Sequence, residues 1–398
     1  MVMQIGCFIR AISSSVMCIR IGSYLYAIIS TLLLTDQESG GNCVVPIANP
    51  VHLPVSTEDI VGSSLSSESS RSDAEFVEID LLRDLKVFSS QMKGLKDSAC
   101  EDRTLPLFSI PLDRLGSASS CVMIGVLDGH GGSGCVEYMR KQLPGSILDA
   151  VKRPHKRKAC DSESVQTVLR EAFVGLDKAF MYAAKRHGDN SGSTIATCTL
   201  LGPSGESHES LKLLLGSLGD SRAVLYKRDP LTCKLVPSAK NPVHRPTKPS
   251  EIKRILAEGG QVNNVQGIDR VLKRVNQTTL GLSVSRAFGD YLMKDPKPVI
   301  SNIAEFTSVD VDLERDECVV LGTDGVFDFI SLAEIGSIVD SAQRTDAAMQ
   351  RAAEHLVNLA RTRGSTDDRT CVIVDFAWNR PSVGSNENDP SISNVHYQ

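Results

Sequence analysis

The chain has 398 residues, of which 41% are hydrophobic and 23% charged, so it carries enough apolar sequence for a large folded core. Its formal net charge of −5 disfavours nucleic acid as the main partner, because no overall basic field exists to displace counterions from phosphates. The 11 cysteines are odd in number and form no CxxC pair, which argues for reduced thiols and against a disulfide framework or a zinc ribbon.

The N-terminal segment, residues 1–35, contains no acidic side chain and includes the apolar run IGSYLYAIISTLLL at 21–34. This run is short for a bilayer span of about 20 residues, but its length suits a signal-peptide core or a weak anchor. Its Ser- and Arg-containing, acid-free surroundings also fit an organelle presequence. Two interpretations of residues 1–35 remain open. One is a targeting or anchoring segment in contact with a membrane or import machinery, and the other is a tail of no specific purpose. For the folded protein we expect a cytoplasmic location, with nuclear entry left open.

The segment 36–75 is rich in Ser, Glu and Asp, and the tail 379–398 is similarly polar. Such sequences cannot bury enough apolar surface to offset their chain entropy, so we predict a disordered linker and a disordered tail. The folded domain is expected over 76–378. Within it, the basic run KRPHKRK at 152–158 fits a nuclear-localisation patch, a dock for acidic phosphoproteins or a solvated loop.

Short β-rich runs alternate with amphipathic stretches along this domain. Strands are predicted at 121–127, 194–201, 211–218, 221–227, 317–323 and 370–376. Helices are predicted at 164–187, which Gly188 would end, at 250–258 and at 346–363. Only Gly219 and Asp220 separate two of the strands, a pattern that predicts a tight hairpin. Much of the sheet structure is therefore expected to be antiparallel, with the long helices packed outside it.

Carboxylates recur where these strands begin or end. The sequence places them in Asp128-Gly129-His130, in Asp324-Gly325 with Asp328, at Asp220, in Asp367-Asp368 and in Glu101-Asp102. Desolvated like charges repel one another, so either water separates these acids or cations bind them. Oxygen ligands select hard ions such as Mg²⁺ or Mn²⁺, and a glycine beside Asp128 lets its carbonyl approach an ion. Taken singly, each acid also fits a turn or a solvated surface, and His130 also fits a structural role.

The order of the motifs carries more information than any one of them. The sequence reads EDR (101–103), VLDGHGG (126–132), SGST (191–194), GDSRAVL (219–225), HRP (244–246), EGGQV (258–262), LSVSRAFGD (282–290), GTDGVFD (322–328) and DDRTCVIV (367–374). Over roughly 95–376 this series resembles the metal-dependent serine/threonine protein phosphatases of type 2C, the PPM family. The resemblance implies an α+β fold, a four-layer α-β-β-α sandwich of two mostly antiparallel sheets flanked by helix pairs. It also implies two Mg²⁺ or Mn²⁺ ions at one edge of the sandwich.

The resemblance also implies roles for individual residues. Asp128 would bridge the two ions, and Gly129 would donate its carbonyl to one of them. Asp324 and Asp367 would complete the coordination of one ion. Two such ions, about 3.5–4 Å apart, activate a bridging water and clamp the phosphoryl oxygens for in-line attack. His130 would then protonate the departing serine or threonine alkoxide as general acid.

Further matched acids would serve the ions less directly. Glu101 and Asp102 would hold metal-bound waters from outside the coordination sphere. Asp220 and Asp328 match positions that hold a third, weaker ion in some family members. Asp290 of the SRAFGD motif has two readings, as a structural residue or as a member of that third site.

Two positions depart from the family pattern. Where many members have an arginine that binds substrate phosphate, this chain has Asp97. In lacking the arginine it resembles a subgroup that includes pyruvate dehydrogenase phosphatase-like members. Lys96 or Arg103 would have to substitute for it. Asp368 stands where Asn is usual, which adds a charge beside Asp367.

Three functions remain to be weighed. The first is a phosphatase acting as a monomer on phosphorylated serine and threonine of protein substrates. The second is a pseudophosphatase that binds phosphoproteins without turnover, for which the missing arginine is the support. The third is a haloacid-dehalogenase-type phosphatase using DVDL at 310–313, but Glu314 stands where that motif needs Thr or Val.

Overall fold

The computed structural model describes residues 84–96, 99–112, 121–153, 161–202 and 211–379. All of them belong to the second of the two units into which the chain divides, residues 44–398. The predicted N-terminal segment, linker and tail lie outside the described residues, apart from residue 379 of the tail. Asp97 and most of the basic run at 152–158 lie outside them as well. None of the helices in the described part combines the length and the apolar character that crossing a bilayer requires.

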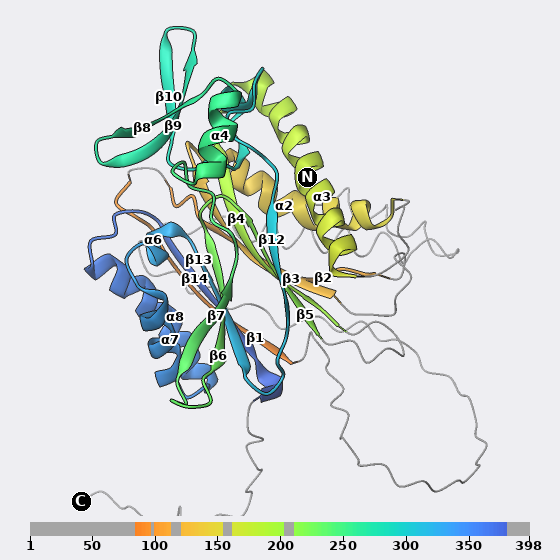
Figure 1. Cartoon of the computed structure of the whole chain (residues 1–398), viewed down its shortest axis with the longest axis vertical. Coiled ribbons are helices and arrows are strands. Elements are labelled where there is room, and N and C mark those ends of the chain that lie inside the picture. Colours follow the sequence, from red (N-terminus) through yellow and green to blue (C-terminus); the bar gives the residue numbers. More distant parts are fainter. Residues whose placement is uncertain (1–83, 97–98, 113–120, 154–160, 203–210, 380–398) are drawn as a thin grey trace, which may run out of the picture. The chain divides into compact units, whose positions relative to one another are not determined.

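Two large sheets form the centre of the fold (Figure 1). One has the order β1 (Leu85–Met92), β14 (Arg369–Phe376), β13 (Asp316–Gly322), β6 (Arg222–Arg228) and β7 (Leu235–Lys240). The other has the order β12 (Glu305–Asp310), β5 (Lys212–Leu218), β4 (Gly192–Leu201), β3 (Cys121–His130) and β2 (Arg103–Ser109), and β11 (Phe288–Gly289) also pairs with β4. All pairings within these two sheets are antiparallel, which confirms the prediction.

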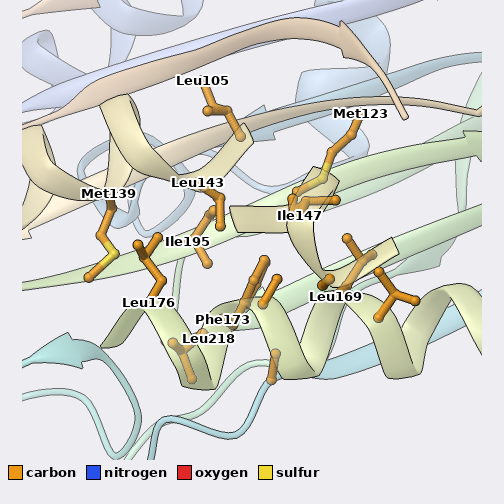
Figure 2. Packing of buried hydrophobic residues seen from close by; sticks show 14 of the residues in the cluster. Leu105, Met123, Met139, Leu143, Ile147, Leu169, Phe173, Leu176, Ile195 and Leu218 are labelled. Atoms are coloured by element: carbon orange, nitrogen blue, oxygen red, sulfur yellow. The ribbon is translucent and has the colours of Figure 1, made fainter. Parts of the chain in front are cut away.

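Helices cover the outer face of each sheet. Beside the sheet that contains β4 lie α2 (Gly134–Val151) and α3 (Ser162–His187). Their apolar sides meet the sheet around Phe173, as Figure 2 shows. Beside the other sheet lie α7 (Leu332–Ser341) and α8 (Asp346–Thr362), which pack on it around Leu356.

A third apolar layer lies between the two sheets. It contains Val126 and Leu213 from one sheet and Leu225, Val319 and Val374 from the other. Every residue of β4, β13 and β14 is buried, because these strands are covered by helices on one face and by the opposite sheet on the other. The predicted α-β-β-α sandwich is therefore confirmed, and burial on both faces explains the nearly continuous apolar runs in its strands.

The predicted helix boundaries follow from local chemistry. Helix α3 begins at Ser162, directly after Asp161. The Asp161 side chain caps this end by accepting a hydrogen bond from the Ser164 N–H at 2.8 Å. Gly188 ends the helix in the left-handed conformation with φ 72°, as predicted from the sequence. The other two predicted helices correspond to α4 (Pro249–Ala257) and α8.

The hairpin predicted at Gly219-Asp220 is wrong. Strand β5 belongs to one sheet and β6 to the other, so the chain crosses from sheet to sheet at these two residues. Both edges of β5 are already paired, with β4 and with β12, which leaves no edge for β6. Gly219 makes this crossing with φ 117°, and a Cβ there would lie 2.4 Å from the Thr194 Cβ.

A small third sheet was not predicted from the sequence. It consists of β8 (Gln261–Val265), β9 (Ile268–Val275) and β10 (Thr278–Leu282), and it packs beside α4. After β10 the chain returns to the large sheet through β11, which pairs with β4, and continues into the short helix α5 (Tyr291–Lys294). This segment carries Asp290, which contributes to the site described next.

Candidate metal centre

Three aspartates from distant parts of the sequence meet where the two sheets come together. Asp128 lies near the end of β3, Asp220 lies on the crossing from β5 to β6, and Asp324 begins the short helix α6 (Asp324–Phe327) after β13. One carboxylate oxygen of each lies within 4.8 Å of the others. Asp220 is buried, and the other two are partly buried. The sequence predicted that these acids would cluster, but it assigned Asp220 only to a third ion.

The cluster is electrostatically unfavourable without a cation. Loss of water around Asp128 raises its pKa well above the usual range, and the charges of Asp102 and Asp324 raise it further. Burial and the neighbouring Asp220 raise the pKa of Asp324 to about 8. Burial likewise raises the pKa of Asp220 to about 6, although Arg245 acts in the opposite direction. A bound divalent cation would relieve this repulsion.

Glu101 and Asp102 directly precede β2 and lie beside the cluster. Asp102 Oδ2 accepts hydrogen bonds from the hydroxyls of Thr323 at 2.9 Å and Thr370 at 2.8 Å. Its other oxygen, Oδ1, is buried with no hydrogen-bond partner among the described residues. Burial raises the pKa of Asp102 to about 7. Glu101 Oε1 accepts from the Gly132 N–H at 2.8 Å, which holds this carboxylate beside the loop that follows β3.

Asp367 and Asp368 lie next to each other but make different contacts. Asp367 Oδ1 is 2.7 Å from Lys96 Nζ, which also lies 3.9 Å from Glu101 Oε2. Burial lowers the pKa of Lys96, but the hydrogen bond to Asp367 and the charges of Asp367, Asp128 and Asp368 together outweigh burial, so the net pKa is raised. Asp368 accepts from the Gly94 N–H at 2.6 Å and the Glu101 N–H at 2.7 Å. The unusual Asp368 therefore fixes the backbone around the site.

His130 makes a contact that the sequence analysis missed. Its Nε2 lies 2.9 Å from Oδ2 of Asp290, which is buried and has a left-handed backbone with φ 53°. Burial lowers the pKa of His130, but the charge and hydrogen bond of Asp290 outweigh it and the net pKa is raised. A Cβ at Gly192 would lie 2.3 Å from both side chains, so only glycine leaves room for this pair. The SRAFGD motif marked Asp290, but no spacing rule connects positions 130 and 290.

Arginines occupy the outer part of the site. Arg245 Nη2 is 2.6 Å from Asp328 and 3.3 Å from Asp220. Arg103 Nε donates to Glu137 at 2.6 Å, and its Nη1 donates to the carbonyls of Cys100 and Asp102. These bonds tie Arg103 to its own loop and to α2. Arg245 belongs to the HRP motif, but its contact with these acids was not predicted from the sequence.

The residues present suit hard divalent cations. The side-chain donors are carboxylate oxygens, the ligands that Mg²⁺ and Mn²⁺ prefer, and Asp102 Oδ1 is a buried acceptor that still lacks a donor. Gly129 is required at its position, since a Cβ there would lie 2.6 Å from the Glu101 carbonyl oxygen. Its own carbonyl stands next to Asp128 in the chain and could serve as a further oxygen ligand.

A four-layer sandwich with an acid cluster where its two sheets meet is the arrangement that the sequence motifs predicted. The chain belongs to the protein phosphatase 2C family, whose model matches residues 86–369. It is 29% identical over 288 residues to "Probable protein phosphatase 1N" of Mus musculus, covering 71% of this chain and 61% of that protein. It is 31% identical over 274 residues to "Probable protein phosphatase 2C 55" of Oryza sativa subsp. japonica, covering 66% and 62%. The chain thus spans about three fifths of these curated relatives.

Solved structures share the fold. A sex-determining protein of C. elegans aligns with a TM-score of 0.58 and 24% identity, over 75% of this chain and 65% of that one. A serine-threonine phosphatase 2C from Toxoplasma gondii aligns with a TM-score of 0.52 and 19% identity, over 72% of this chain and 99% of that one. At these identities the comparison supports the architecture alone.

Proposed function

We propose that this chain hydrolyses phosphoserine and phosphothreonine in proteins with the help of two Mg²⁺ or Mn²⁺ ions. The observation that carries the proposal is the cluster of Asp128, Asp220 and Asp324, in which one carboxylate oxygen of each lies within 4.8 Å of the others and Asp220 is buried. Asp128, the Gly129 carbonyl, Asp324 and Asp367 are the proposed ligands. When bound, the ions would activate a water molecule for attack and balance the charge on the phosphoryl oxygens.

The protein residues would position the reactants and move one proton. Glu101 and Asp102 would orient water around the ions through acceptor oxygens such as the unpartnered Asp102 Oδ1. His130 would donate its proton to the departing alkoxide, and Asp290 at 2.9 Å would hold the ring and favour the imidazolium. In this arrangement Asp290 is a positioning residue.

Lys96 is the better of the two predicted contacts to substrate phosphate. Its ammonium nitrogen lies 2.7 Å from Asp367 Oδ1, and the Lys96 side chain is 40% exposed. Once an ion neutralises Asp367, that ammonium group becomes available to a phosphate oxygen. Arg103 is less suited, because its guanidinium group is engaged by Glu137 and by backbone carbonyls.

The first experiment measures Mn²⁺-dependent phosphate release from a phosphothreonine peptide. We expect turnover by the natural chain and loss of turnover and of ion uptake in Asp324→Asn. Asp310→Asn is the matched control, since this exposed acid pairs with Lys212 at the end of β5 remote from Asp220. Loss of activity in Asp310→Asn, together with an aspartyl-phosphate trapped on the natural chain, would instead favour the dehalogenase-type mechanism.

The second experiment addresses His130. We expect His130→Asn to slow hydrolysis of the phosphothreonine peptide by about 10²–10⁴-fold. Hydrolysis of p-nitrophenyl phosphate should fall far less, because its leaving group departs without a proton. Gly192→Ala, which inserts a Cβ between His130 and Asp290, should give the same selective loss. Equal losses on both substrates would contradict the role of His130 as general acid.

A pseudophosphatase that binds phosphoproteins is the alternative, and the family arginine replaced by Asp97 is what favours it. It predicts saturable binding of the phosphopeptide and of Mn²⁺ without phosphate release. For location, we propose the cytoplasm with access to the nucleus, given the reduced-thiol pattern of the cysteines. A fluorescent fusion with and without residues 1–35 tests that proposal, and organelle or membrane localisation that depends on these residues would overturn it.

A further inference from the structure

Two arginines bracket the acids that match a third ion position. Arg245 Nη2 lies 2.6 Å from Asp328 Oδ2 and 3.3 Å from Asp220 Oδ2. Arg222 Nη2 lies 3.5 Å from the other carboxylate oxygen of Asp328. Two carboxylates are thus matched by two guanidinium groups, which remain charged at every working pH. These four side chains together carry no net charge, so the nearby negative charge comes from Asp128 and Asp324, which belong to the proposed two-ion site.

The backbone fixes Arg245 beside the crossing that carries Asp220. The neighbouring His244 is fully buried, its N–H donates to the Gly219 carbonyl at 2.8 Å, and its Nδ1 accepts from the Gly219 N–H at 3.1 Å. The His244 carbonyl in turn accepts from the Ser285 N–H at 3.0 Å. These bonds fix the backbone before Arg245 beside the crossing, which places the arginine side chain within reach of Asp220.

The guanidinium group also spans the gap that an ion would have to fill. It reaches the buried Asp220 and the half-exposed Asp328 with the same nitrogen, so it lies between the two carboxylates. An ion coordinated by both acids would have to displace this nitrogen and would then face it as a like charge. The residues that match a third site in sequence therefore do not fit an ion in this chain.

We propose that Arg245 is a built-in cation that takes the place of a third divalent ion, so that the folded protein binds two ions. This inference rests on the proposed function, which supplies the two-ion site. Unlike a weakly bound ion, Arg245 cannot be removed by a chelator or by dilution. The positive charge next to Asp220 is therefore constant over the whole range of metal concentration.

The test is calorimetric titration of the metal-stripped full chain with Mn²⁺. We expect two ions for the natural chain and for Asp328→Asn, and one additional, weaker ion for Arg245→Ala. Arg351→Ala removes an exposed arginine of α8 and is the matched control, with two ions expected. Circular dichroism establishes that each variant is folded.

Two outcomes would overturn the inference. One is uptake of three ions by the natural chain that falls to two in Asp328→Asn. The other is a folded Arg245→Ala that still binds only two. If Arg245→Ala does not fold, the comparison of the natural chain with Asp328→Asn decides alone. Failure of the proposed function gives a different result, in which the natural chain binds no ions or Asp324→Asn binds as many as the natural chain.

Discussion

The buried ion pair of Asp177 and Lys294 should be one of the most sensitive points of the fold. Asp177 lies in α3 and is fully buried, and both of its oxygens accept from Lys294 Nζ, at 3.0 and 2.9 Å. Oδ1 also accepts from the Gly289 N–H at 2.7 Å, and Oδ2 accepts from Asn302 Nδ2 at 2.8 Å. The pair therefore attaches the segment around Asp290 to α3.

Lys294→Met removes the cation and leaves the carboxylate buried. Breaking one side of such a pair costs about 3–5 kcal/mol. Since Asp177 keeps the bonds from Gly289 and Asn302, we expect a loss near the lower limit, about 3 kcal/mol in the free energy of unfolding. For a domain of this size that corresponds to a fall in melting temperature of roughly 6–9 °C.

Urea unfolding of the metal-free protein measures this loss, with Lys185→Met as the control. Lys185 pairs with Asp295 at the surface, where water screens the charges, so its removal should leave the free energy of unfolding almost unchanged. The double variant Lys294→Met with Asp177→Asn should recover part of the loss, because no charge is left buried. A cost below about 1 kcal/mol for Lys294→Met, or no recovery in the double variant, would refute the reasoning.

Three further predictions concern the core, the site and the response to pH. Phe173→Ala, in the layer between α3 and its sheet, should cost about 3–5 kcal/mol in urea unfolding. Gly325→Ala would place a Cβ 2.0 Å from the Asp368 carbonyl oxygen, so calorimetry should find much weaker Mn²⁺ binding, and unchanged binding would contradict the geometry. His244, whose Nε2 lies 3.3 Å from Glu305 Oε2, and the charge of Arg286 lower the pKa of Glu305 from 4.5 to about 2, so its stabilising effect is complete above pH 4.5 and is lost as the pH falls toward 2. Because the side chain is more than a third exposed, Glu305→Gln should lose only about 1 kcal/mol at neutral pH, and the difference in melting temperature from the natural chain should disappear near pH 2.

The fold was predictable from the sequence where each element carries its own signal. Apolar runs gave β3, β4, β13 and β14, and Gly188 marked the end of α3, because burial and left-handed termini leave local patterns. The crossing at Gly219 was misread as a hairpin, since two-residue Gly-X loops have the same composition whether or not the flanking strands pair. Which edge of a strand is free depends on the rest of the sheet.

The site was predictable to the extent that its residues stand in motifs. The acids at 128, 220 and 324 were expected to meet because each follows or precedes a strand, and the structure brings them together. The partner of His130 and the position of Arg245 depend on side-chain direction across long sequence separations. No periodicity or spacing encodes such contacts, so they become visible only in the folded chain.

The origin of the acids in both sheets has a thermodynamic consequence. Asp128 comes from one layer and Asp324 and Asp367 from the other, and Asp102 already joins the layers through Thr323 and Thr370. An ion bound by this set would link the two layers. The unfolded chain has no equivalent site, because these ligands come together only on folding. By mass action, a free ion concentration of one hundred times the dissociation constant would add about 2.7 kcal/mol to the free energy of unfolding. If the ions bind as proposed, the supply of divalent cation would help to determine the fraction of chains in which the two layers are joined, separate from its part in any reaction.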